Sequence, residues 1–256
     1  MINKVINVRL AGGLGNQLYQ FSYAYYLFKK HGFDFIEIDC EGMSSYNENW
    51  GYLLQDVFDK NKIESIVKYS PSIIHKCRIA RILNKCPRLG YILGLCNDNN
   101  QELFSDKIIY NKIYLDGYFE NFFAREKYLE MIKGLLRDDL RIPIKDNVVV
   151  VNVRGGEYAR LGYSKPSDID YYKKQINRII SEKDDVEFHL VTDDIEYAVS
   201  LFQETINFSK IHEPCPFDNF RVLYSAKTKI LSRSTFSKWA GYLSSEFSDS
   251  IYLDEF

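Results

Sequence analysis

The stretch Ile6-Asn-Val-Arg-Leu-Ala-Gly-Gly-Leu-Gly-Asn-Gln-Leu-Tyr-Gln-Phe-Ser-Tyr-Ala24 is the strongest indication of the fold. Its apolar start predicts a strand, and the glycine-rich turn leads into a helix that begins near Asn16. The glycines of the turn let a ligand approach the main chain, and the helix start presents unpaired N–H groups and a positive dipole end. We therefore expect a corner that suits an anionic or polyhydroxylic ligand.

This turn matches neither of the common nucleotide-binding loops. It lacks the Gly-Lys-Ser/Thr of a P-loop, the third spaced glycine of a dinucleotide fingerprint and a clear acidic partner. Taken alone, the glycines are equally compatible with a plain strand-to-helix turn.

The bulk composition excludes several classes. The 256 residues carry 33 basic and 35 acidic side chains, a balance that argues against a general nucleic-acid binder. Five scattered cysteines without Cys-x-x-Cys spacing indicate a reducing compartment and no structural zinc site. We recognise no signal peptide and no apolar run of membrane-spanning length, so a cytoplasmic location is expected. The cysteines are Cys40, Cys77, Cys86, Cys96 and Cys215.

Strand and helix signals alternate along the chain, which predicts an α/β fold with parallel sheets. We expect strands at residues 5–10, 35–38, 113–115, 148–153, 187–192, 209–211 and 229–231. Helices are expected at residues 17–31, 124–136, 171–182, 195–202, 218–225 and 237–243. The polar, proline-bearing stretch at 141–147 precedes an apolar strand, so we expect domains at 1–145 and 146–256, each a Rossmann-like unit, facing across a cleft.

Residues 62–95 are basic and amphipathic, with seven Lys or Arg against one acidic residue, Glu64. Such a segment can lie on an anionic membrane surface, which would make the protein peripheral at the inner face of the cell membrane. One or two ordinary helices capping the first domain are the alternative.

Charged and hydroxyl side chains follow the strands expected in the second domain. Arg154 ends the first of these strands beside two glycines and suits a phosphate, or else forms a structural ion pair. Asp193 and Asp194 end the next strand and can bind a base or ribose, although one of them is expected to cap the following helix. Ser232-Arg-Ser-Thr-Phe-Ser237 places hydroxyls and an arginine at another helix start.

Five motifs, in matching order and spacing, resemble glycosyltransferase family 11, the α-1,2-fucosyltransferases that use GDP-fucose. Gly12-Gly-Leu-Gly-Asn-Gln-Leu18 resembles the family's first signature, and Tyr114-Leu-Asp-Gly-Tyr-Phe119 its Leu-Asp-Gly-Tyr-Trp/Phe. Residues 152–158 fall on His-x-Arg-Arg-Gly-Asp-Tyr, residues 188–194 on Phe-x-x-Phe-Ser-Asp-Asp, and Ser234-Thr-Phe-Ser237 on Ser-Thr-Phe-Ser-Trp-Trp. The resemblance covers nearly the whole chain and implies a GT-B-like fold.

The chain departs from these motifs at several positions. Asn152 stands in place of histidine, Gly155 in place of the second arginine and Glu157 in place of aspartate. In the last motif, Arg233 replaces asparagine and Lys238 replaces the first tryptophan. Because Arg233 also lies at a strand end of the second domain, we expect it to replace the charge missing at Gly155.

The resemblance implies an inverting transferase that moves L-fucose, or a related GDP-linked deoxysugar such as colitose, to a hydroxyl of an oligosaccharide. An α-1,2 linkage in surface polysaccharide (O-antigen) synthesis, a lipid-linked acceptor, and no metal or other cofactor are expected. Arg154 and Glu157 are the expected catalytic residues, Glu157 as the base. The expected donor-binding residues are Asn152, Gly156, Tyr158, Asp193, Asp194, Arg233, Ser234, Thr235 and Ser237. Gly13, Gly15, Asn16 and Gln17 are expected to line the cleft from the first, acceptor-side domain.

Two other classes stay open. Asp168-Ile-Asp170 could be the Asp-x-Asp of a metal-dependent GT-A transferase, or it could cap the helix that follows. The altered motif at 152–158 could also belong to a non-catalytic protein that binds a sugar or a nucleotide.

Overall fold

The computed structural model describes residues 3–41, 43, 51–71, 85–122, 126–163, 168–203, 206–244 and 249–252. The chain forms two compact units, Met1–Arg137 (unit 1) and Asp138–Phe256 (unit 2). The division falls before the expected boundary at 145/146. The segment after residue 138 belongs to unit 2 because the Ile142 N–H donates to Ser225 Oγ at 2.8 Å, and the Arg221 guanidinium donates to Asp139 O at 3.0 Å.

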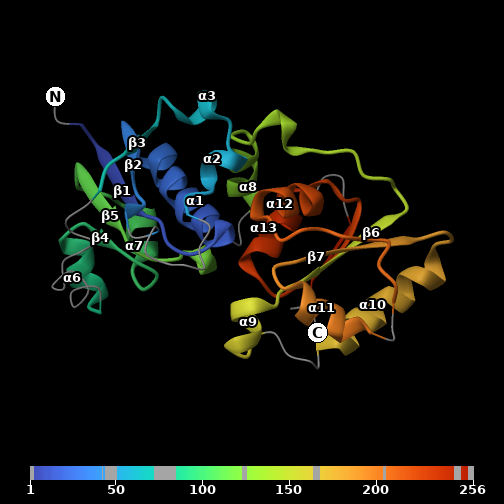
Figure 1. Cartoon of the computed structure of the whole chain (residues 1–256). Helices are drawn as coiled ribbons and strands as arrows, with labels where there is room; N and C mark the ends of the chain where they lie inside the picture. Colours follow the sequence, from blue (N-terminus) through green and yellow to red (C-terminus); the bar gives the residue numbers. More distant parts are fainter. Residues whose placement is uncertain are drawn as a thin grey trace. The chain divides into compact units, whose positions relative to one another are not determined.

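Unit 1 contains a five-stranded sheet in the order β3-β2-β1-β5-β4, and every pairing in it is parallel (Figure 1). The strands are β1 Val5–Arg9, β2 Phe35–Asp39, β3 Val67–Tyr69, β4 Leu95–Cys96 and β5 Lys112–Leu115. The helices are α1 Leu14–His31, α2 Leu54–Val57, α3 Lys60–Ile63, α6 Pro87–Ile92, α7 Gln101–Asp106 and α8 Glu126–Lys133, with a 3₁₀ turn η2 at Glu120–Phe122.

Helix α1 forms the centre of unit 1 and packs on β1 and β2. It begins at Leu14, earlier than expected, because Gly13 takes an extended conformation as its N-cap. It ends where Gly32 adopts a left-handed conformation (φ 65°) and donates its N–H to Phe28 O. The charges of Lys29 and Lys30 in the last turn complement the negative end of the helix dipole.

Unit 2 repeats this plan with the sheet order β10-β9-β6-β7-β8, again all parallel. The strands are β6 Val148–Val153, β7 Glu187–Thr192, β8 Lys210–Ile211, β9 Thr228–Leu231 and β10 Asp249–Tyr252. The helices are α9 Gly156–Arg160, α10 Ile169–Glu182, α11 Ile195–Phe202, α12 Pro216–Ser225 and α13 Thr235–Leu243, with a 3₁₀ turn η3 at Asp138–Leu140.

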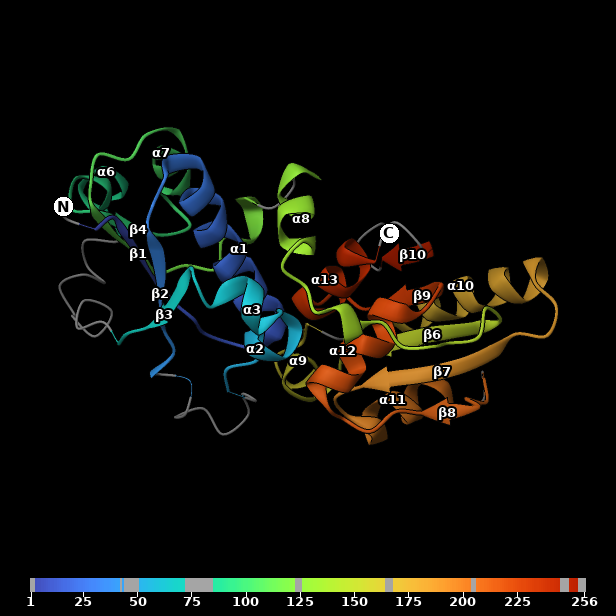
Figure 2. The same ribbon diagram turned by 90° about the horizontal axis from the view of Figure 1, so that it is seen from above.

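Strand β6 is buried on both faces, as its valine run predicts. Val149, Val151 and Val153 share one core cluster with residues of α10 and α11. Helices α12 and α13 contact β6, β7 and β9, and they lie on the opposite face of the sheet from α10 and α11 (Figure 1 and Figure 2). Helices on both faces of an open parallel sheet define a Rossmann-like, doubly wound unit. The α/β class and the two Rossmann-like units expected from the sequence are confirmed.

The basic segment at 62–95 is not one continuous amphipathic helix. Residues 67–69 form strand β3, residues 87–92 form α6, and residues 72–84 lie outside the described residues. In the described part of the chain, no helix combines the length and apolarity needed to cross a bilayer.

Candidate active site

The carboxyl ends of β6 and β9 mark the position in unit 2 where a ligand is most readily bound. From β6 the chain builds β7 and β8 on one side and β9 and β10 on the other, so the order of strands reverses between β6 and β9. Open parallel sheets bind ligands outside the carboxyl ends of the strands at such a switch point. Arg154 follows β6 directly, and Ser232 and Arg233 follow β9.

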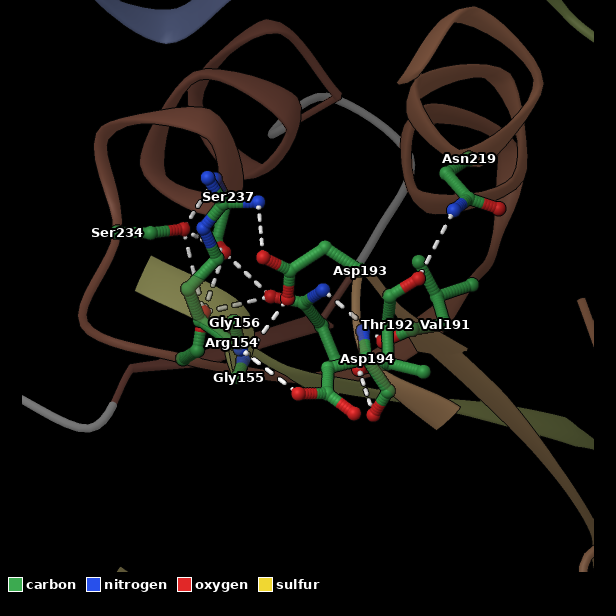
Figure 3. A network of polar contacts seen from close by, with 12 residues as sticks. Arg154, Gly155, Gly156, Val191, Thr192, Asp193, Asp194, Asn219, Ser234 and Ser237 are labelled. Atoms are coloured by element: carbon green, nitrogen blue, oxygen red, sulfur yellow. Dashed lines mark hydrogen bonds and ion pairs between the residues drawn. The ribbon is translucent and has the colours of Figure 1, made fainter. Parts of the chain in front are cut away.

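Arg154 is held at this point by an ion pair. Its Nη1 lies 2.9 Å from Oδ2 of Asp193 (Figure 3). Its guanidinium lies 5.3 Å from the ring centre of Tyr158. The Arg154 side chain keeps 32% of its surface exposed. The structural ion pair, one of the two alternatives, is therefore present, and contact of the part-exposed guanidinium with a phosphate stays a prediction.

The two aspartates after β7 bind the turn that follows Arg154. Gly155 N donates to Asp193 Oδ1 at 2.8 Å, and Gly156 N donates to Asp194 Oδ2 at 3.2 Å. Asp194 also caps α11, because its Oδ1 accepts the Tyr197 N–H at 3.0 Å. Contact of these carboxylates with a base or ribose stays a prediction. In the structure they fix the main chain around Arg154.

Gly155 has a steric reason to be glycine. A Cβ at this position would lie 2.6 Å from Asp194 Cβ and 2.9 Å from Tyr197 Cδ1. Gly156 adopts φ 47°, a left-handed conformation that glycine tolerates best. The arginine found in the family at position 155 has no room in this backbone, so placing it there cannot restore the family's arrangement.

Asn152 lies at the centre of a buried cluster of hydroxyl groups. Its Nδ2 donates to Val191 O at 3.1 Å, and its Oδ1 accepts hydrogen bonds from the hydroxyls of Ser232, at 2.7 Å, and Ser237. Ser234 Oγ lies 2.6 Å from Ser237 Oγ and accepts the Ser237 N–H as the N-cap of α13. These side chains bond one another, which supports a positioning role and leaves their direct contact with a donor a prediction.

Two further expected donor-binding residues lie at the start of α13. Arg233 is exposed and Thr235 is half-buried. Burial raises the pKa of the Tyr172 hydroxyl well above its usual value, and the positive charge of Arg233 opposes that shift. Tyr172 in turn donates to Asn152 O at 3.0 Å.

Glu157 and Tyr158 lie on the short helix α9, directly after the two glycines. Glu157 is exposed, and Tyr158 is half-buried with its ring centre 5.5 Å from that of Tyr163. A part for Glu157 in proton transfer stays a prediction.

In unit 1 the four expected cleft residues of the glycine-rich turn differ in burial. Gly13 and Asn16 are half-buried at the start of α1, and Gly15 is buried. Gln17 is fully buried. Its Nε2 donates to Gly12 O at 3.0 Å and to Gly51 O at 2.8 Å, and its Oε1 accepts the Leu53 N–H at 2.9 Å. The Gln17 side chain thus holds two loops together.

Asp168 is the N-cap residue of α10, and Asp170 is exposed in its first turn. Among the described residues, no three His, Cys, Asp or Glu side chains gather as a metal site would require.

Comparison with known proteins identifies the family. The model of glycosyl transferase family 11 matches residues 98–256, more than half of the chain. The chain belongs to this family. It is a glycosyltransferase, as the sequence motifs indicated.

One similar protein is an α-1,2-colitosyltransferase of Escherichia coli, 24% identical over 262 residues that cover 93% of this chain and 87% of the relative. Among solved structures, NodZ α-1,6-fucosyltransferase soaked with GDP-fucose matches with a TM-score of 0.61 at 15% identity. The match covers 94% of this chain and 92% of the NodZ chain. A related crystal structure of fucosyltransferase NodZ comes from Bradyrhizobium. POFUT1 in complex with GDP-fucose has a TM-score of 0.60 at 11% identity, covering 98% of both chains. These likenesses confirm the GT-B-like fold.

Proposed function

We propose that the protein transfers a deoxyhexose, L-fucose or colitose, from a GDP-linked donor to a hydroxyl group of an oligosaccharide. The observation that carries this proposal is the fixed, part-exposed guanidinium of Arg154 at the switch point of unit 2, with Arg233 at the neighbouring strand end. The colitosyltransferase relative and the GDP-fucose in the NodZ and POFUT1 structures support the choice of donor.

The proposed reaction is a single displacement. The acceptor oxygen forms a bond to the anomeric carbon, the bond from that carbon to the β-phosphate oxygen breaks, and the configuration inverts. GDP leaves with an additional negative charge, which Arg154 stabilises through charge-assisted hydrogen bonds. The acceptor proton passes to a base, for which Glu157 is our candidate because it is exposed and follows Arg154 by three residues.

The donor residues divide into two kinds under this proposal. Arg154, Arg233, Tyr158 and Thr235 contact the nucleotide sugar with their side chains, and Gly156 lets the pyrophosphate approach the main chain. Asn152, Ser234, Ser237, Asp193 and Asp194 hold these groups in place through the hydrogen bonds described above.

A thermal-shift panel of GDP, UDP, CMP and ADP tests the nucleotide. A ligand at 100 times its Kd stabilises the folded state by about 2.7 kcal/mol, so GDP is expected to raise the unfolding midpoint by several degrees and the others by much less. Equal shifts for all four nucleotides would refute selective GDP binding.

Turnover distinguishes an enzyme from a binding protein of the same fold. The purified chain is expected to release GDP from GDP-fucose or GDP-colitose, and to retain that activity in excess EDTA. Binding of GDP without any donor cleavage would favour the non-catalytic alternative. Loss of activity in EDTA would favour a metal-dependent route.

We also propose that the acceptor is a lipid-linked glycan for surface polysaccharide, joined through an α-1,2 linkage, and that α6 meets the membrane. Leu89, Ile92 and Leu93 expose 40%, 61% and 49% of their surfaces, and the exposed cations Lys85 and Arg88 precede them in the chain. Apolar side chains beside basic ones suit the surface of an anionic bilayer.

Vesicle flotation tests this contact. Binding to vesicles of phosphatidylglycerol and phosphatidylcholine should decrease with salt and should be lost in Ile92→Glu. Ile180→Glu is the matched control, because Ile180 is 54% exposed and lies on α10, in the other unit. No binding of the wild-type chain at low salt would refute the proposal.

A further inference from the structure

Unit 1 has its own switch point. From β1 the chain builds β2 and β3 on one side, whereas β4 and β5 lie on the other, so the strand order reverses between β1 and β5. Val8 pairs with Leu115 in this part of the sheet, and the next residues are Arg9 and Asp116. The two charged side chains therefore lie side by side at the carboxyl ends of adjacent strands, where open parallel sheets bind ligands.

Arg9 and Asp116 form an ion pair that retains much of its hydrogen-bonding capacity. Arg9 Nη1 lies 3.1 Å from Asp116 Oδ1, and the side chains expose 32% and 28% of their surfaces. Among the described residues, these two side chains make no other hydrogen bond. A guanidinium has five N–H donors and a carboxylate has two acceptor oxygens, so donors and acceptors remain for a ligand.

In the turn after Asp116, the side chain of Tyr118 is exposed and that of Phe119 is buried. The carboxylate of Asp98 accepts the main-chain N–H groups of Tyr118 and Phe119, and Phe119 adopts φ 59°. The Phe119 ring is buried and stacks on Tyr23 with centroids 4.4 Å apart. Tyr118 is left 50% exposed, and its hydroxyl has no partner among the described residues.

We propose that Arg9, Asp116 and Tyr118 form a subsite for the acceptor sugar, an inference that rests on the proposed function. A pyranose ring packs an apolar face against Tyr118, while its hydroxyls accept from Arg9 and donate to Asp116. The paired charges favour a neutral polyhydroxylic ligand over an anion. The switch point of unit 2 has a different charge. There β9, the neighbour of β6, is followed by Arg233, so a second cation accompanies Arg154.

Saturation-transfer NMR on the full chain with saturating GDP tests this subsite. The probes are the methyl pyranosides of galactose, glucose, mannose, N-acetylglucosamine and N-acetylgalactosamine. We expect at least one of them to bind, and its Kd to rise about tenfold or more in Tyr118→Ala and Asp116→Asn, while Tyr118→Phe keeps most of the affinity.

Matched controls come from the same sheet. Tyr69 is 59% exposed at the end of β3, and Glu37 pairs with Lys112 at 2.8 Å, so Tyr69→Ala and Glu37→Gln should leave the sugar Kd unchanged. Failure of all five sugars to bind the wild type, or equal losses in the control variants, would overturn the subsite. GDP binding, followed separately by thermal shift, should persist in every variant. Its absence from the wild type would refute the proposed function rather than the subsite.

Discussion

Asp193 binds both the side chain and the main chain of the turn after β6. Its Oδ2 lies 2.9 Å from Arg154 Nη1, and its Oδ1 accepts the Gly155 N–H at 2.8 Å. The orientation of the guanidinium and the path of the glycine turn therefore depend on one carboxylate.

Asp193→Asn should lower donor turnover about 10- to 100-fold, because a charge-assisted hydrogen bond contributes about 1.5–3 kcal/mol. Its effect on folding should stay below about 1 kcal/mol, since the ion pair is part-exposed. Initial rates and urea unfolding measure the two effects. Asp170→Asn, on the exposed start of α10, is the control and should keep wild-type activity. Loss of activity in that control would revive the Asp-x-Asp alternative.

Gly155→Ala should destabilise the fold by about 1–3 kcal/mol, because the new Cβ would lie 2.6 Å from Asp194 Cβ. Gly13→Ala is the comparison. A Cβ there meets nothing within 4 Å, and φ is −72°, so the cost should stay below about 1 kcal/mol. Chemical unfolding of both variants gives the difference. Equal stabilities would show that the backbone at 155 relaxes freely.

Asn152→Ala should cost about 1–3 kcal/mol of folding stability, because the buried hydroxyls of Ser232 and Ser237 lose their shared acceptor. In the double variant with Ser237→Ala, the loss of folding stability should be smaller than the sum of the two single losses, as expected for groups in one hydrogen-bond network. Asn147→Ala removes a hydrogen bond to Asp185 O at an exposed position and serves as the control. Strict additivity in the double variant would contradict the network.

Lys229 gives unit 2 a pH dependence. It is fully buried, its Nζ donates to Ser244 Oγ at 2.6 Å, and burial lowers its pKa to about 7 although Asp249 opposes the shift. Between pH 7 and about 10.4 the unfolded chain binds the proton that the folded chain has lost, so stability rises with pH over this range. Relative to Lys229→Met, the wild type should gain a few kcal/mol from pH 7 to 10. Parallel stability curves for the two proteins would contradict the shifted pKa.

The long, strongly patterned elements were predictable from the sequence. Strands 148–153 and 187–192 and the helix at 195–202 have the expected bounds, because a valine run, a β-rich stretch and an aspartate N-cap are local signals. Strands β3, β4 and β10 were missed. Two of them have only two or three residues, and β10 begins with Asp249 and Ser250, so their strand character comes from pairing with a neighbour.

The gathering of several candidate residues in unit 2 was predictable from the sequence, and their roles toward a donor stay predictions. Strand ends and helix caps placed Arg154, Asp193 and Ser234 together in one unit. That Gln17 clamps two loops, and that Arg9 pairs with Asp116 more than a hundred positions away, depends on tertiary contacts without a local pattern. The family motif around Tyr118 was the one available signal for that region.

The most direct test of the account is donor turnover by Arg154→Ala, with Arg154→Lys and Arg178→Ala beside it. Arg178 is exposed on α10, and its Nε lies 3.8 Å from Glu182 Oε1. The variant Arg178→Ala is therefore the control for the removal of a positive charge from the surface. We predict that GDP release from GDP-fucose or GDP-colitose falls about a hundredfold or more in Arg154→Ala, recovers in part in Arg154→Lys and is unchanged in Arg178→Ala. More than half of wild-type activity in a folded Arg154→Ala variant would contradict the central role of this guanidinium.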